Sequence, residues 1–446
     1  MEIGILAVAA ALAWPRPVAR AKMPAPNVIL ISIDTLRPDH LGCYGYDKPT
    51  SPNLDRFASE AAIFDNCFSH APMTGPSCAS FLTGFLPHET KVLGNRSRVP
   101  QEVVTVAEIL RADGYRTYAV VCNYVLREGQ GFEQGFDLYD ARLEEVELVR
   151  DHPERIAEKA TARALEILGA NDGERFFLWL HYQDPHGPYT PPAPYDSLFS
   201  RVGAIPRHLA FGRNVKGKGS IPTYQRLGNH TNYCYYVAQY DGEIRYLDEH
   251  LGRLFSALGD LGLYERSLII LTADHGEALG ESDYYFAHGH NLDQCLIRVP
   301  LLVKHGAIAP GRRSDVAQHM DIVPTILDVA RVKSRLPYRG RSLLAPRAAK
   351  PVVYSELRMK SHAVIVDSLK LVVDGDGAAH LFDLKRDPAG AVDIASQPSS
   401  RERLRALAEI LRRMKDEDLL GVRENATEEP LSEEEAEKLR SLGYVD

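Results

Sequence analysis

Cysteine is scarce in this chain of 446 residues, which contains only six. Six cysteines are too few for a disulfide scaffold at this length, and none has C-x-x-C spacing. An excess of positive charge is also missing, since 52 Lys and Arg face 60 Asp and Glu for a net charge of −8. We therefore do not expect nucleic acid as a partner, although a local positive pocket is compatible with this balance.

Long hydrophobic runs are missing after the first 21 residues, where no stretch approaches the roughly 20 apolar residues of a membrane span. The apolar run Ile3–Trp14 followed by Ala19-Arg20-Ala21 predicts a cleaved signal peptide over residues 1–21. Glu2 and the lack of a basic residue before the run leave a membrane anchor or a misassigned start as alternatives. We expect an exported protein, periplasmic or extracellular, with no span after cleavage; a cytoplasmic or anchored protein is the alternative.

The remaining composition is that of a globular protein, with 45% hydrophobic and 25% charged residues. The length exceeds one ordinary domain of roughly 150 residues, so a large domain with a smaller one is expected. We place the larger, catalytic domain at residues 27–345. A C-terminal subdomain with a small antiparallel sheet and helices follows at residues 346–446.

Short apolar runs alternate with amphipathic helical patterns through the larger domain. This alternation predicts an α/β fold, with a large, mostly parallel central sheet flanked by helices. Ligands bind at the carboxyl ends of strands in such sheets, where Asp34 and Asp274-His275 fall. The predicted strands are Asn27–Asp34, Tyr118–Val121, Phe176–His181, Ser267–Thr272 and Val299–Val303, and the predicted helices are Val103–Arg111, Pro153–Leu168 and Tyr235–Leu258.

The pattern changes after about Arg341. Three short runs joined by tight turns predict antiparallel strands, and a charged amphipathic helix follows them. Residues 185–220 are rich in Pro, Gly and basic side chains and predict a long loop beside the site. The C-terminal strands are Ala363–Val366, Lys370–Val373 and His380–Leu384, the helix is Arg401–Leu420, and an acidic tail or helix spans Glu424–Glu437.

Two strand ends supply the first candidate site. Asp34 follows one buried run, and Asp274 and His275 follow another. Each residue alone could simply cap a turn, which is the commoner use of such residues. Together, two carboxylates and a neutral imidazole form a donor set for a divalent cation.

Thr74 is the candidate nucleophile. Pro76 and Ser77 are typical of a helix start, which would put the Thr74 hydroxyl at a positive helix end, facing an anion. The alternative is that Thr74 and Ser77 only cap the helix.

Several longer motifs follow one another along the chain: IDTLRPDHLG at 33–42, TGPS at 74–77 with LTG at 82–84, DPHGPY at 184–189 and TADHGE at 272–277. With these motifs the chain resembles the sulfatase family of the alkaline phosphatase superfamily. The match continues through His288-Gly289, Arg298–Pro300, Asp321–Thr325, Leu381–Leu384, Asp387-Pro388 and Leu439–Tyr444, and so covers nearly the whole chain.

The chain departs from the family pattern at the nucleophile. The family carries Cys-x-Pro-Ser-Arg, whose Cys becomes formylglycine, whereas this chain has Thr74 and Cys78 at the two ends of that motif. No formylglycine is therefore expected. The second aspartate is Thr35, the Asp-Asn pair is Asp274-His275, and the Lys-Trp-His segment has no counterpart around Cys122-Asn123. These features resemble the threonine branch of the superfamily, which includes phosphoethanolamine transferases and lipoteichoic acid synthases.

The resemblance implies a role for each motif residue. One divalent ion would be held by one acidic residue, the threonine and the Asp-His pair; imidazole favours Mn²⁺ or Zn²⁺, with Ca²⁺ or Mg²⁺ as alternatives. Two histidines would bind the anion or assist the leaving oxygen. The implied metal ligands are Asp34, Thr74, Asp274 and His275, the catalytic residues are Thr74, His186 and His288, and the substrate-binding residues are His186, His288, Lys91 and Asn123.

These roles imply a metal-dependent hydrolase that cleaves a sulfate or phosphate ester through Thr74. The substrate would be a small anionic ester, with a glycan or lipid headgroup as its carrier. Threonine has no second hydroxyl with which to expel sulfate, so a phosphorus ester is favoured. A phosphoryl-group transferase and an inactive anion-binding relative are the alternatives.

Overall fold

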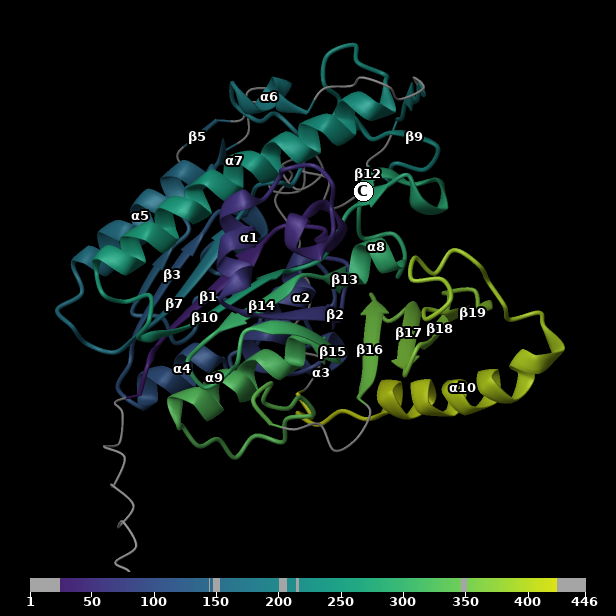
Figure 1. Cartoon of the computed structure of the whole chain (residues 1–446). Helices are drawn as coiled ribbons and strands as arrows, with labels where there is room; N and C mark the ends of the chain where they lie inside the picture. The colour runs from purple at the N-terminus through teal and green to yellow at the C-terminus, as the bar shows by residue number, and fades with distance from the viewer. Residues whose placement is uncertain are drawn as a thin grey trace, which may run out of the picture.

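The computed structural model describes residues 25–143, 145–146, 153–199, 207–213, 216–345 and 351–422. The predicted signal peptide and the acidic stretch Glu424–Glu437 lie outside these ranges. Within them, a large twisted sheet forms the body of the molecule and a small antiparallel sheet stands beside it (Figure 1). No helix in the described ranges is long and apolar enough to cross a membrane.

The large sheet has the order β13-β2-β14-β10-β1-β7-β3-β4, with β15 also paired to β2. Its centre, from β10 through β1, β7 and β3 to β4, is parallel, whereas β14 runs antiparallel to β10 and β2. The strands are β1 (Asn27–Ile33), β2 (Ala62–Phe68), β3 (Arg116–Val121), β4 (Leu138–Asp140), β7 (Phe176–Tyr182), β10 (Ser267–Ala273), β13 (Arg298–Val299), β14 (Leu301–Lys304) and β15 (Gly311–Gln318).

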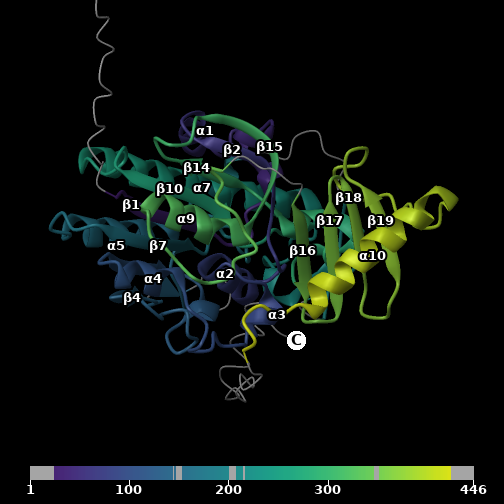
Figure 2. The same ribbon diagram turned by 90° about the horizontal axis from the view of Figure 1, so that it is seen from below.

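Helices cover both faces of this sheet, which confirms the α/β fold expected from the sequence (Figures 1 and 2). β1, β7 and β10 are completely buried, as their uninterrupted apolar sequences require of strands covered on both sides. One face carries α1 (Pro52–Ser59), α5 (Ala157–Gly169) and α7 (Tyr233–Asp260), and the other carries α2 (Thr74–Thr83), α4 (Val106–Ala112) and α9 (Ile322–Ala330).

The small sheet contains the three C-terminal strands expected from the sequence and a further strand, β16, which the sequence did not predict. Leu407 and Leu411 of α10 pack against Val364, Leu371 and Leu381 of this sheet. The domain boundary at residue 345 stays a prediction. The elements are β16 (Val352–Leu357), β17 (Ser361–Val366), β18 (Leu369–Val373), β19 (Ala379–Asp383) and α10 (Arg401–Asp416).

The remaining elements are short and lie outside the two sheets described above. The helix expected from Pro153 begins at Ala157, because Pro153–Glu154 pairs as a short strand with Glu145–Val146. In the described part of residues 185–220, where the sequence predicted a long loop, the chain forms a one-turn helix and two short strand pieces. The remaining elements are α3 (Pro87–Thr90), α6 (Tyr195–Leu198), α8 (Gln294–Ile297), β5 (Glu145–Val146), β6 (Pro153–Glu154), β8 (Ala210–Phe211), β9 (Ser220–Ile221), β11 (Ala278–Leu279) and β12 (Tyr285–Ala287).

Candidate active site

The strand ends of β1 and β10 bring the acidic residues together. These strands are parallel neighbours with Ile33 opposite Ala273, and the Asp274 N–H donates to the Ile33 carbonyl at 3.2 Å. Asp34 and Asp274 are therefore side by side although 240 positions separate them in the sequence. Ligand atoms of Asp34, Asp274 and His275 all lie within 4.8 Å of one another, and the three side chains are completely buried.

The His275 ring presents a lone pair to the two carboxylates of this cluster. Its Nδ1 lies 2.9 Å from the Gly276 carbonyl oxygen and must carry the hydrogen, while burial lowers the pKa of His275 to about 4. The Nε2 lone pair then faces Asp34 Oδ1 at 3.7 Å and Asp274 Oδ2 at 3.6 Å. Asp274 Oδ2 accepts no hydrogen bond from the described part of the chain. Converging lone pairs in a buried site repel one another, so these donors fit a divalent cation.

Backbone and side-chain donors fix the two carboxylates. Asp274 Oδ1 accepts hydrogen bonds from the backbone N–H of Thr35 at 3.2 Å and of His275 at 2.7 Å. Asn123 Nδ2 donates to Asp34 Oδ2, which brings this weak sequence candidate next to the predicted metal ligands. These contacts leave the opposite edges of the carboxylates to face His275.

His181 is a neighbour of this cluster that the sequence reading missed. Its Nε2 lies 4.0 Å from Asp34 Oδ2, and its Nδ1 is 2.8 Å from Ser32 Oγ. Burial lowers its pKa to about 3, so the ring is neutral. The available signal was its place at the end of a predicted strand, since β7 pairs with β1 and sets His181 opposite Ser32.

Thr74 is the first residue of α2, so the helix begins two residues earlier than Pro76, where the sequence predicted its start. The buried Thr74 Oγ1 lies 3.4 Å from His275 Nε2, and its hydroxyl donates toward that lone pair. The Gly75 N–H donates to Asn95 Oδ1 at 2.9 Å. The candidate nucleophile therefore borders the cluster at the positive end of a buried helix.

Ser77 fixes α2 to the segment that carries the predicted metal ligands Asp274 and His275. Its hydroxyl donates to the Asp274 carbonyl oxygen at 2.5 Å and lies 3.1 Å from Nδ1 of the buried His319. His319 Nε2 is 3.3 Å from Thr272 Oγ1 on β10. This network ties the first turn of α2 to the end of β10 and so sets the position of Thr74.

Of the two remaining histidine candidates, His288 lies next to His275, and His186 lies next to His288. The ring centroid of His288 is 4.5 Å from that of His275 and 5.2 Å from that of His186. His186 Nδ1 is 2.8 Å from the Gly187 carbonyl oxygen, and His288 Nδ1 is 3.1 Å from Glu277 Oε1. The fold thus brings both rings to the cluster, and their catalytic roles stay predictions.

Lys91 forms an ion pair with the C-terminal part of the chain. It directly follows α3, and its Nζ donates to Asp418 Oδ2 at 2.8 Å, which ties this end of the helix to the segment after α10. This ion pair connects the two parts of the chain and gives no support to the substrate-binding role predicted for Lys91.

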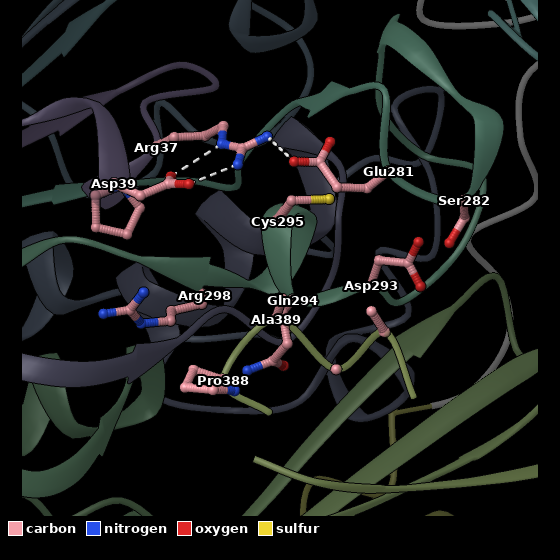
Figure 3. Close-up of a pocket in the computed structure, with 13 residues that line it drawn as sticks. Arg37, Asp39, Glu281, Ser282, Asp293, Gln294, Cys295, Arg298, Pro388 and Ala389 are labelled. Carbon is pink, nitrogen blue, oxygen red and sulfur yellow. Dashed lines mark hydrogen bonds and ion pairs between the residues drawn. The ribbon is translucent and has the colours of Figure 1, made fainter. Parts of the chain in front are cut away.

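A separate cavity of about 340 Å³ is lined by residues that include Arg37, Glu281 and Cys295 (Figure 3). Arg37 borders it and is held by Asp39 and Glu281, while its Nη1 also donates to the Glu277 carbonyl oxygen at 2.9 Å. Pro388–Ala391 form the wall contributed by the C-terminal part of the chain. None of the predicted site residues is among those that line this cavity, so it is distinct from the Thr74 cluster.

The sequence model of the sulfatase family matches residues 26–332. This stretch includes β1, α2 and β10 with the residues that follow them. The chain therefore belongs to the sulfatase family of the alkaline phosphatase superfamily and is an ester hydrolase, as the motifs predicted.

Similar proteins include enzymes named for different esters. The choline-sulfatase of Rhizobium meliloti (strain 1021) is 26% identical over 427 residues, covering 84% of this chain and 83% of that protein. A structure in complex with its substrate D-glucosamine-2-N,6-O-disulfate has a TM-score of 0.72 at 20% identity, covering 90% of this chain and 100% of the other. The phosphonate monoester hydrolase of Agrobacterium radiobacter has a TM-score of 0.71 at 18% identity, covering 87% and 95%. The two structures share the fold.

Proposed function

We propose that this chain is a metal-dependent hydrolase that cleaves a small phosphorus ester, with sulfate esters as poorer substrates, through a Thr74 nucleophile. One observation carries the proposal: the Thr74 hydroxyl lies 3.4 Å from His275 Nε2, at the edge of a buried Asp-Asp-His cluster. A hydroxyl group placed only to cap a helix has no need of such a neighbour.

The residues of the cluster would bind the metal ion and activate the nucleophile. Asp34, Asp274 and His275 would hold the divalent ion together with Thr74. The bound ion would lower the pKa of the Thr74 hydroxyl and neutralise charge on the transferring group. The positive end of α2 faces the same side as Thr74 and favours an anionic substrate there.

Hydrolysis proceeds in two displacements in this scheme. The Thr74 hydroxyl gives its proton to Nε2 of His288 or His186 as its oxygen attacks phosphorus, the bond from phosphorus to the ester oxygen breaks, and the departing alkoxide takes that proton. Water then attacks the same phosphorus and gives a proton to the same imidazole nitrogen, the bond to Thr74 Oγ1 breaks, and the threonine oxygen takes that proton. In their protonated forms, the two histidines donate hydrogen bonds through Nε2 to the oxygens on which charge develops.

The nucleophile decides between the two ester classes. A hydrated formylglycine has a second hydroxyl that can expel sulfate by breaking a carbon–oxygen bond. Thr74 has one hydroxyl, so its covalent intermediate must be released by attack at phosphorus or sulfur. Metal-assisted displacement at phosphorus is a common enzymatic route, and a phosphonate monoester hydrolase shares this fold.

A substrate panel tests the proposal. Wild-type protein would be assayed with a phosphate monoester, a phosphodiester, a phosphonate monoester and an aryl sulfate, each with Mn²⁺, Zn²⁺, Ca²⁺ or Mg²⁺. We expect phosphorus ester turnover to exceed aryl sulfate turnover. Thr74→Val, which keeps the side-chain shape, should lose roughly a thousandfold in kcat, by comparison with other lost nucleophiles.

Thr74→Ser is the matched control, since it keeps the hydroxyl and should retain much of the activity. Near-normal rates in Thr74→Val, or aryl sulfate turnover far above that of every phosphorus ester, would overturn the proposal. Product analysis with an added alcohol separates hydrolysis from group transfer to an acceptor.

A further inference from the structure

Glu277 lies beside the predicted catalytic histidines and is not itself one of the predicted site residues. Its side chain is completely buried, and its Oε1 is 3.1 Å from His288 Nδ1. Its other oxygen, Oε2, accepts the hydroxyl of the buried Tyr189 at 3.0 Å. A buried carboxylate is costly unless it is hydrogen-bonded, and here each oxygen has its own donor.

This carboxylate connects two separate segments of the site. His288 follows β12, whereas Tyr189 belongs to the DPHGPY segment, three residues after His186. The rings of His186 and His288 lie 5.2 Å apart, so one side chain fixes the segments that deliver both. The backbone of Glu277 is held in turn, because Arg37 Nη1 donates to its carbonyl oxygen.

The loop that carries His288 needs such a support. Phe286 has φ of 53° and Gly289 has φ of 71°, which are left-handed conformations on either side of His288. Phe286 is not glycine, so its conformation is strained and must be held by packing. Tyr236 stacks on the Phe286 ring with centroids 4.7 Å apart, but that contact does not orient the imidazole of His288.

The contact with Glu277 determines which nitrogen of His288 carries hydrogen. A carboxylate oxygen only accepts hydrogen bonds, so the Nδ1 that faces it must be the N–H donor. Nε2 is then the ring nitrogen that can serve the substrate. An imidazole oriented by a carboxylate in this way is a recurring device for fixing both ring angle and tautomer.

We propose that Glu277 is a positioning residue: it holds His288 in the Nδ1–H tautomer and in register with His186, without touching the substrate. The inference rests on the proposed function insofar as His288 serves the substrate. The hydrogen bond between Glu277 and His288 can be measured without turnover. The positioning role of Glu277 and the proposed function can therefore be tested separately.

Kinetics of single and double variants test the catalytic part. Glu277→Ala should lower kcat about 10- to 100-fold, the usual cost of losing an orienting partner, with a smaller change in KM. Glu277→Gln should recover much of that loss, because its amide oxygen still accepts from Nδ1–H. Tyr189→Phe is the matched comparison: it removes the other hydrogen bond of Glu277 and leaves the His288 contact, so kcat should fall less than in Glu277→Ala and the Nδ1–H tautomer of His288 should persist.

The double variant separates positioning from a general structural role. If Glu277 acts through His288, Glu277→Ala combined with His288→Ala should be within about twofold of His288→Ala alone. Losses that multiply would overturn the proposal. Bound metal and thermal unfolding would be measured for every variant, and equal loss of metal in Glu277→Ala and Asp274→Asn would also contradict it.

Nuclear magnetic resonance supplies a test without turnover. In the full chain labelled with ¹⁵N-histidine, His288 should show a protected Nδ1–H resonance, assigned by its disappearance in His288→Ala. We expect that resonance to vanish in Glu277→Ala, to persist in Glu277→Gln and to remain in Thr74→Val. Its absence from the wild type, or its survival unchanged in Glu277→Ala, would overturn the inference even if Thr74 proved to be the nucleophile.

Discussion

Thr74 Oγ1 lies 3.4 Å from Nε2 of His275, a contact between residues 201 positions apart in the sequence. Two separate features of the fold produce it. β10 delivers His275 beside Asp34 at the carboxyl edge of the sheet, and the first turn of α2 is fixed to the same strand end through Ser77. The hydroxyl is therefore held at the edge of the predicted cation site by the backbone framework rather than by a flexible loop.

Replacing the Asp274 carboxylate should weaken metal binding and raise the stability of the metal-free protein. Asp274→Asn keeps the oxygen that accepts two backbone hydrogen bonds and replaces Oδ2, which faces His275 and Asp34. We expect the variant to lose its bound metal, measured by elemental analysis. In the metal-free state, we expect it to unfold at a higher temperature than wild type, because a repulsive charge is gone.

The metal also makes stability depend on its concentration. Wild type should gain about 2.7 kcal/mol at a metal concentration 100 times its Kd, and Asp274→Asn should gain none. Chelation that leaves the activity and unfolding temperature of the wild type unchanged would contradict the metal assignment.

Placing the family's cysteine at position 74 should not lead to formylglycine formation. Thr74→Cys recreates the first residue of the sulfatase motif, but Cys78 still stands where the family has arginine and is completely buried in α2. We expect the peptide with position 74 to keep an unmodified cysteine when coexpressed with a formylglycine-generating enzyme. Mass spectrometry would show this, with Thr74→Cys combined with Cys78→Arg as the comparison. Clear conversion of the single variant would refute the prediction.

Lys370 should make stability rise with pH in the alkaline range. This buried lysine of β18 donates to the carbonyl oxygen of Leu292 and to Gln294 Oε1, and burial lowers its pKa to about 8 from the ordinary 10.5. Between these two values the unfolded chain holds a proton that the folded chain has released. Stability therefore increases with pH over this interval, by roughly 3 kcal/mol in total.

The comparison with Lys370→Met isolates this effect from other alkaline titrations. The free energy of unfolding, measured by urea denaturation, should rise in the wild type relative to Lys370→Met as pH goes from 8 to 10.5. A difference between the two proteins that is constant, or that falls, over this range would contradict the assignment.

The central sheet was predictable because its strands are buried on both faces. Largely apolar sequences such as Asn27–Ile33 leave no polar face for solvent, and the carboxylates after them mark the functional edge. Other strands carry weaker signals. β15 is largely exposed and polar, and the run expected as one strand over Val299–Val303 is split at Pro300, which cannot donate to a ladder.

The site was predictable where its residues follow strands and less so where they act on one another. Asp34, Asp274 and His275 were found because each follows a recognisable run. His181 and Glu277 were not predicted as site residues. His181 belongs to the site through its contact with Asp34, and Glu277 through its contact with His288, and sequence spacing does not reveal such contacts. Lys91 and Asn123 were both weak candidates, Asn123 the weaker of the two. Only tertiary contacts distinguish Asn123 beside Asp34 from Lys91 beside Asp418.

Trapping the covalent intermediate tests the central claim most directly. The wild-type holoenzyme would be mixed with its best phosphorus ester, quenched in acid during turnover, digested and examined by mass spectrometry, with Thr74→Val treated in parallel. We expect one phosphoryl group on the hydroxyl of Thr74 in the wild type and none on that peptide in the variant. A label on any other residue, or Thr74→Val turning over at the wild-type rate, would contradict the account.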